Sequence, residues 1–194
     1  MKVLFVATLA CTLALAAPPS ALADETPRTT YVTLEQQTVF VGGEVVPDIN
    51  GTVLRFIRGP VGLYTFFYVD RAYADAIVGP AFAPAKWLVV SAGACIERSD
   101  DGQWRVGGMV WMGDERFTSV TFLETGASGF WGRTEFAWRP APWAGVGVLG
   151  DLGLGIGPRL EVNVPYVDLH LWGASLYDWK EGRPAGVAGI RLDL

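Results

Sequence analysis

The chain has very few residues that could form disulfides or bind metals. It contains two cysteines and one histidine in 194 residues. Cys11 lies in an apolar N-terminal segment that we expect to be removed, so Cys95 would remain alone and could not form an intramolecular disulfide. With His170 as the only histidine, a zinc site of the usual type is not expected. We therefore predict no metal and no cofactor.

Long apolar runs are also missing after residue 24. No stretch there approaches the roughly 18 apolar residues of a membrane-spanning helix, although 51% of the chain is hydrophobic. Such a chain must either bury its apolar surface in an unusually large core or expose it to lipid. The 24 glycines are too widely spread for stable helices, whereas bent strands use glycine.

An excess of positive charge is absent as well. The formal net charge is -5, and it would become about -6 after loss of Lys2 with the N-terminal segment. Such an acidic chain has no electrostatic footprint for nucleic acid, so we predict no nucleic-acid partner.

The first 23 residues have the pattern of a secretory signal peptide. Lys2 precedes an apolar run over residues 3–17, and Ala21-Leu22-Ala23 supplies the small residues of a cleavage site before Asp24. A buried helix or a membrane anchor is the alternative, but the run is too short to span and Pro18-Pro19 would end a helix. We expect export through the Sec pathway and one mature domain over residues 24–194.

From about residue 50 the sequence alternates between apolar and polar residues, in segments of about ten residues separated by turn-forming residues. In residues 130–139 the even positions are mostly apolar and the odd positions carry Arg133, Glu135 and Arg139. Residues 158–164, 167–172 and 187–194 repeat the pattern, which predicts an all-β protein.

Alternation alone does not show which face contacts water, because a soluble lipocalin-like barrel and a membrane barrel share it. A signal peptide without disulfides favours the cell envelope. Tryptophans lie mainly near segment ends, as in the aromatic girdle of a membrane barrel: Trp87, Trp104, Trp111, Trp138, Trp143 and Trp179. The pattern favours a closed, up-and-down transmembrane β-barrel.

The last segment, residues 186–194, resembles the C-terminal insertion signal of small Gram-negative outer-membrane β-barrel proteins. Its apolar positions are Ile190, Leu192 and Leu194, where Leu194 replaces the final phenylalanine usual in that class. The resemblance covers residues 30–194 as a pattern. It implies an outer-membrane location, contact with outer-membrane lipid and recognition by the outer-membrane insertion machinery.

Counting turns back from Leu194 predicts twelve strands, with ten as the alternative. The predicted inner turns are Gly59-Pro60, Pro84–Lys86, Gly113–Glu115, Pro140–Pro142 and Pro165-Tyr166. The predicted outer loops are residues 43–50, Asp70–Tyr73, Ser99–Gly102, Gly126–Ser128, Asp151–Gly157 and Asp178–Arg183.

Under this topology a polar set faces the lumen: Arg105, Arg133, Glu135, Arg139, Asp151, Arg159, Glu161, Asn163, Asp168, His170, Arg191 and Asp193. Its charges nearly balance, which is typical of a paired network filling a narrow interior. A narrow pore or ligand cavity for a small solute is the second interpretation.

Catalysis is the third interpretation. Outer-membrane barrels resembling lipid A deacylases or palmitoyltransferases use a serine with a histidine, and Asp168 could orient His170 from position i-2. A nucleophile is missing, because Ser175 has the opposite parity and Ser128 falls in a predicted loop. We therefore expect a non-enzymatic outer-membrane barrel, acting as a narrow channel or an envelope structural protein. A lipid-modifying enzyme using His170 and a soluble periplasmic lipocalin-like binding barrel are the alternatives.

Overall fold

A computed structural model describes residues 30–98, 102–114, 116–164 and 167–194. The expected signal peptide and its cleavage site lie outside these residues, as does the turn expected at residues 165–166. The described residues contain no helix long and apolar enough to cross a membrane.

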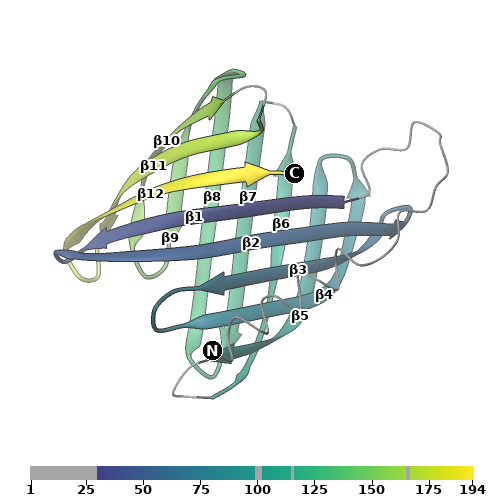
Figure 1. Ribbon diagram of the computed structural model, residues 1–194, viewed down its shortest axis with the longest axis horizontal. Coiled ribbons are helices and arrows are strands. Elements are labelled where there is room, and N and C mark those ends of the chain that lie inside the picture. Colours follow the sequence, from purple (N-terminus) through teal and green to yellow (C-terminus); the bar gives the residue numbers. More distant parts are fainter. Residues whose placement is uncertain (1–29, 99–101, 115, 165–166) are drawn as a thin grey trace.

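Twelve antiparallel strands form a single closed barrel (Figure 1). The strands are β1 (Thr30–Val41), β2 (Glu44–Arg58), β3 (Val61–Val69), β4 (Ala74–Ala85), β5 (Leu88–Arg98), β6 (Trp104–Gly113), β7 (Phe117–Gly126), β8 (Gly129–Ala141), β9 (Ala144–Asp151), β10 (Gly155–Val164), β11 (Leu169–Asp178) and β12 (Arg183–Asp193). Each strand pairs with the next along the chain, and β12 pairs with β1 to close the sheet. The up-and-down barrel is confirmed, and twelve strands are correct rather than ten.

β1 begins and β12 ends at the same end of the barrel. The N–H of Val32 donates to the carbonyl of Leu194 at 3.2 Å, and the N–H of Leu194 donates to Val32 at 2.8 Å. We call this end the termini end, and the opposite end, with the β1–β2 and β11–β12 turns, the far end. In Figure 1 the front strands β12, β1 and β2 cross the steeper strands β6–β8 behind them, which shows the strand tilt that closure requires.

The prediction of a loop over residues 43–50 is wrong. β1 ends at Val41 and β2 begins at Glu44, so that only Gly42 and Gly43 connect them. Both glycines have positive φ, 61° and 83°, as a two-residue hairpin turn requires. The strands then pair without a break, with Gln37 opposite Asp48.

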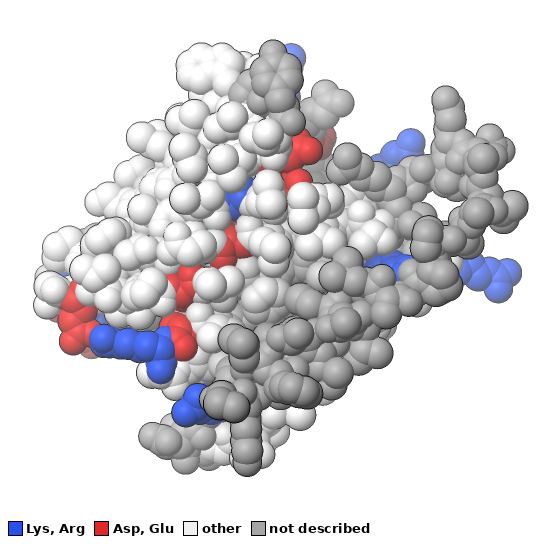
Figure 2. Space-filling model, viewed as in Figure 1, with Lys and Arg blue, Asp and Glu red and all other residues white. Residues whose placement is uncertain are grey.

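The outward-facing side of the barrel carries almost no charge. In the described strands, charged residues at outward positions are confined to Arg55, Arg58 and Arg98, close to strand ends. The positions between are uncharged and mostly apolar, and many are exposed, as at Leu160 with 64% and Ile96 with 66% of its surface accessible. On the face shown in Figure 2, charged residues are restricted to the edges and to a narrow diagonal row.

Exposed tryptophans lie at both ends of this apolar band. Trp87 and Trp143 are in turns at the termini end, and Trp104 and Trp179 are at the far end. Trp111 does not belong to the aromatic girdle expected from the sequence, because its side chain lines the barrel interior. Its odd position in β6 places it inside, next to Met109.

Candidate functional site

The barrel encloses a cavity of about 970 Å³. At the termini end it is lined by the exposed residues Lys86, Asp114 and Asp168. Along the barrel axis it extends to Gln37 and Arg133. The interior is therefore not completely filled by side chains, and its accessible part connects to the termini end.

One arc of the barrel gives this cavity an apolar wall. The residues of this wall come from β2, β3, β5, β6 and β7: Leu54, Phe56, Phe66, Val89, Met109, Trp111, Val120 and Phe122. They belong to one continuous apolar cluster, in which the rings of Phe66 and Phe122 have centroids 5.2 Å apart. This wall explains why β3 is apolar on both faces in the sequence, since one face contacts the cavity and the other faces outward.

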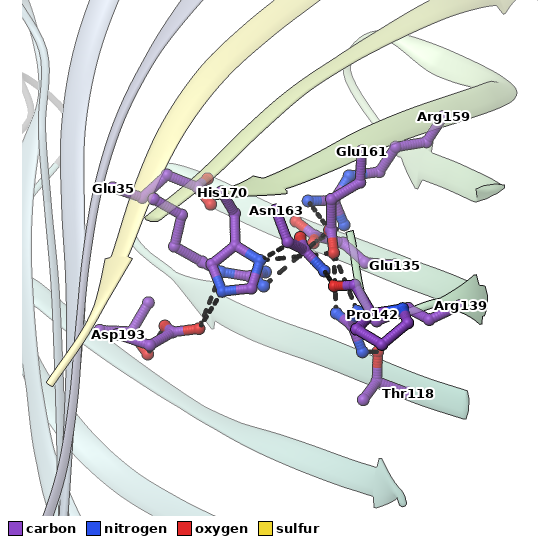
Figure 3. Close-up of polar contacts among 12 residues, drawn as sticks. Glu35, Thr118, Glu135, Arg139, Pro142, Arg159, Glu161, Asn163, His170 and Asp193 are labelled. Carbon is purple, nitrogen blue, oxygen red and sulfur yellow. Dashed lines mark hydrogen bonds and ion pairs between the residues drawn. The ribbon is translucent and has the colours of Figure 1, made fainter. Parts of the chain in front are cut away.

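The remaining arc gives the cavity a charged wall, formed by β1, β8, β10, β11 and β12. Its cavity-lining residues are Glu35, Arg133, Glu135, Arg139, Asn163, His170, Arg191 and Asp193. Behind them Arg159 and Glu161 are buried, with side chains 3% and 1% exposed. Figure 3 shows labelled members of this wall, among them Glu135, Glu161 and His170, meeting in the barrel interior.

Most charges of this wall are tightly paired. Glu135 accepts a hydrogen bond from Arg159 at 2.7 Å and forms an ion pair with Arg133 at 2.8 Å. Glu161 accepts a hydrogen bond from Arg139 at 3.0 Å and forms an ion pair with Arg159 at 3.2 Å. Four arginines and four carboxylates take part, so the wall is close to neutral.

Trp172 holds two of these arginines in place. The guanidinium groups of Arg159 and Arg133 lie 4.5 and 5.5 Å from its ring, a cation–π arrangement. The ring lies over Gly189 of the next strand, where a Cβ atom would come within 2.5 Å of it. Glycine at this position therefore provides the space that the indole occupies.

Asp168 does not orient His170, although the catalytic interpretation would require it. Nε2 of His170 lies 3.1 Å from Asp193, and Nδ1 lies 2.5 Å from the amide oxygen of Asn163 and 3.5 Å from Glu161. Asp168 is exposed in a turn with a φ of 46°. That left-handed conformation directs the chain into β11, whose register places Asn163 directly opposite His170.

Neither serine considered as a nucleophile contacts this histidine. Ser175 faces outward on β11, and Ser128 lies in the β7–β8 turn, bound to Glu97 at 2.6 Å and Arg105 at 2.7 Å. Within the described ranges, no group of histidine, cysteine, aspartate and glutamate is arranged to hold a metal ion.

Arg105 does not join the charged wall. It lies in a separate cluster near the far end, where its guanidinium contacts Glu124 at 2.7 Å, Glu97 at 3.0 Å and Asp75 at 3.9 Å. The hydroxyl of Tyr73, in the loop before β4, lies within hydrogen-bonding distance of both Glu97 and Asp75. The cluster fills the far end of the barrel beside β4–β7.

An apolar plug fills the far end beside β9–β12. It consists of Leu149, Trp172, Leu176, Ala185 and Val187, all at most 5% exposed. Asp151, expected in the lumen network, ends β9 here and accepts from the N–H of Gly153 at 2.8 Å. Both far-end clusters lie beyond the lining of the cavity.

The mouth of the cavity has a fixed negative charge at Asp114. The backbone N–H groups of Phe117 and Arg116 donate to its carboxylate at 2.9 and 2.7 Å. These bonds hold the pKa of Asp114 below its ordinary value. The carboxylate is therefore ionised at neutral pH.

Of the twelve polar residues predicted to face the lumen, the structure brings nine together in the charged wall. Arg105 and Asp151 lie at the far end, and Asp168 lies at the mouth. Sequence reasoning missed Glu35, Gln37, Asp75 and Glu124. Parity could have identified Asp75 and Glu124, but in β1 the polar outward residues Gln36 and Thr38 hide the alternation.

Comparison with known proteins gives likeness in structure only. A solved KdgM porin is similar with a TM-score of 0.56 and 6% identity, over 82% of this chain and 98% of that chain. A second structure, the KdgM porin in complex with disordered oligogalacturonate, has a TM-score of 0.53 and 6% identity, over 84% and 98%. Neither a protein-family model nor a curated protein sequence matches the chain. At this identity the likeness shows the fold alone: the closed, twelve-stranded antiparallel barrel of this chain is similar in structure to these porin barrels.

Proposed function

We propose that this chain is an outer-membrane β-barrel that acts as a narrow channel for small solutes. The observation that carries the proposal is the nearly charge-free outward surface around a barrel whose interior holds the charged residues and an accessible cavity. A water-soluble barrel would expose the charged face and bury the apolar one. Here nearly all charges of the strands are inside, and the exposed large side chains are mostly Leu, Ile, Val, Phe and Trp, as in a lipid-facing band.

The channel is narrow because its far half is occupied by side chains. Solute entering at the termini end meets about 970 Å³ of free volume and then the apolar plug and the Arg105 cluster. By analogy with bacterial barrels, the termini end faces the periplasm and the far end faces the cell exterior.

The proposal gives His170 no catalytic role. Its nitrogens are engaged by Asn163 and Asp193, and a serine within hydrogen-bonding distance is lacking in the described part of the chain. A general base must reach the proton that it abstracts, and this histidine has no such partner.

We do not propose oligogalacturonate, which is bound in the KdgM porin complex, as the solute of this chain. Such a polyanion needs an excess of cations along its path, whereas the arginines of the charged wall are matched by carboxylates. A near-neutral wall favours solutes with little net charge.

Conductance in planar lipid bilayers tests this proposal. We expect small single-channel steps and a reversal potential near zero in a potassium chloride gradient, because the interior charges balance. If the protein inserts as a folded barrel and yet passes no current, its interior is closed and the proposal of a channel is wrong.

A further inference from the structure

The charged wall contains one cation and one anion that are held much less tightly than the others. The inner pairs of Arg133, Arg159 and Arg139 have nitrogen–oxygen distances of 2.7 to 3.0 Å. Arg191 is 3.4 Å from Asp193 and 3.9 Å from Glu161. Glu35 has only one ion pair, with Arg133 at 3.9 Å. Glu35 and Arg191 therefore have the longest ion-pair distances among the charged residues that line the cavity, although Arg133 and Arg159 also have nitrogens without a hydrogen-bond partner.

Glu35 and Arg191 lie side by side. They are directly opposite each other in the register of β1 and β12, and both line the cavity. The two side chains form no ion pair with each other among the described contacts, and Nε of Arg191 is buried without a hydrogen-bond partner. A carboxylate and a guanidinium therefore face the cavity together, each able to receive a group of opposite charge.

The other side of the same cavity is apolar and rich in rings. Phe56, Phe66, Trp111 and Phe122 line it, and no charged residue lies among them in the apolar cluster. A solute that binds both sides needs an apolar body to cover this wall. A head that carries both charges can form a close ion pair with Glu35 and with Arg191, whereas a single charge can do so with one of them.

The geometry points to a zwitterionic solute with an apolar, mainly aromatic body, of the class of short apolar peptides and aromatic amino acids. Its ammonium group binds Glu35, its carboxylate binds Arg191, and its side chains contact the apolar wall. The cavity volume of about 970 Å³ is in the range that holds ligands of this size. This inference rests on the proposed channel and names its solute class.

Isothermal titration calorimetry on the full barrel in a maltoside detergent tests the inference, with L-leucyl-L-phenylalanine as the probe. N-acetyl-leucyl-phenylalanine lacks the ammonium group, leucyl-phenylalanine amide lacks the carboxylate, and glycylglycine lacks the apolar body. We expect each of the three to bind at least about tenfold more weakly than the zwitterionic dipeptide, since each loses one class of contact.

Two substitutions assign the head groups. In Glu35→Gln, affinity for the dipeptide should fall about tenfold, to the level of the N-acetyl form, whose own affinity should not change. In Arg191→Met, dipeptide affinity should fall to the level of the amide, whose affinity should be unchanged. Glu44→Gln and Arg71→Met are matched controls, because these residues form an exposed pair at the far end, 66% accessible each; both should leave binding intact.

Equal affinity for all four probes would overturn the inference, as would loss of binding in the control variants. Absence of dipeptide binding by a barrel that conducts would overturn it while the channel remains. Absence of conductance with dipeptide binding retained would instead remove the channel. If either variant fails to fold, judged by heat-modifiable gel migration, the probe series on the unmodified protein decides alone.

Discussion

Glu161 is the residue on which most of the charged wall depends. Its carboxylate, 1% exposed, contacts Arg139 at 3.0 Å, Arg159 at 3.2 Å, His170 at 3.5 Å and Arg191 at 3.9 Å. Removal of a buried carboxylate with several cationic partners lowers the stability of the protein, because the partners stay buried without an opposite charge beside them.

Replacement of Glu161 by glutamine should therefore destabilise the barrel by about 3–5 kcal/mol. The reason is that glutamine keeps the volume but removes the negative charge. Urea unfolding of the reconstituted protein, followed by heat-modifiable migration, measures this change. Glu44→Gln removes the carboxylate of an exposed pair and should change stability by less than about 1 kcal/mol; equal effects of the two variants would contradict the role of Glu161.

Gly189 is the second residue whose role can be tested in isolation. A Cβ at this position would lie 2.5 Å from the ring of Trp172, which is fixed between Arg159 and Arg133. We expect Gly189→Ala to destabilise the barrel by about 1–3 kcal/mol, as overpacking does. Gly173→Ala on the neighbouring strand is the matched control, since its Cβ has its nearest neighbour at 3.7 Å. The urea midpoint should fall for Gly189→Ala and stay nearly constant for the control.

Individual strands were predictable wherever the two faces differ in polarity. In β8 and β10 the outward residues are apolar and the inward residues charged, so that the alternation is visible in the sequence. In β1 the outward residues include Gln36 and Thr38, and in β3 the inward residues include Tyr64 and Phe66. Alternation is hidden in both, because polarity no longer distinguishes the faces.

The partner of His170 shows why contacts were harder to predict than strands. Alternation identifies neighbours at i and i+2 on one face, which suggested Asp168. The contacts actually form between strands, with Asn163 of β10 and Asp193 of β12. Cross-strand neighbours depend on the register of each pair, which a single sequence does not specify.

A charge placed on the outward face of a strand should be costly at mid-height and tolerated at the rim. Leu160 lies in the middle of β10 and is 64% exposed, so we expect Leu160→Arg to cost about 2–4 kcal/mol in a bilayer. Leu152→Arg, in the far-end turn after β9, should cost about 0–1 kcal/mol. Unfolding of both variants in lipid vesicles gives the comparison. Equal, small costs would show that the outward face does not contact lipid.

The complete barrel is divided into an accessible half and a filled half, a division that the sequence did not predict. Closure, strand number and the polarity of the interior followed from turn spacing and parity. The cavity depends instead on which side chains meet across the lumen, as Arg133 meets Gln37 at 2.8 Å across 96 residues of sequence. Such contacts are set by strand tilt and by the stagger of the closed sheet.

Removal of the apolar plug should widen the channel. Leu149→Ala and Leu176→Ala each shorten a fully buried side chain of the plug, and we expect a larger single-channel conductance in both. Leu171→Ala shortens an outward-facing leucine of the same strand as Leu176 and should leave conductance unchanged. Unchanged conductance in the plug variants would place the constriction elsewhere.

The central claim is that the chain is a closed barrel inserted in the outer membrane through its apolar outward face. Gel migration of the isolated outer-membrane fraction, with and without heating in detergent, tests location and closure together. The account predicts recovery in that fraction and a shift in apparent size on heating, because a closed barrel stays folded in detergent until it is heated. Recovery in the soluble periplasm without detergent, or migration independent of heating, would contradict it.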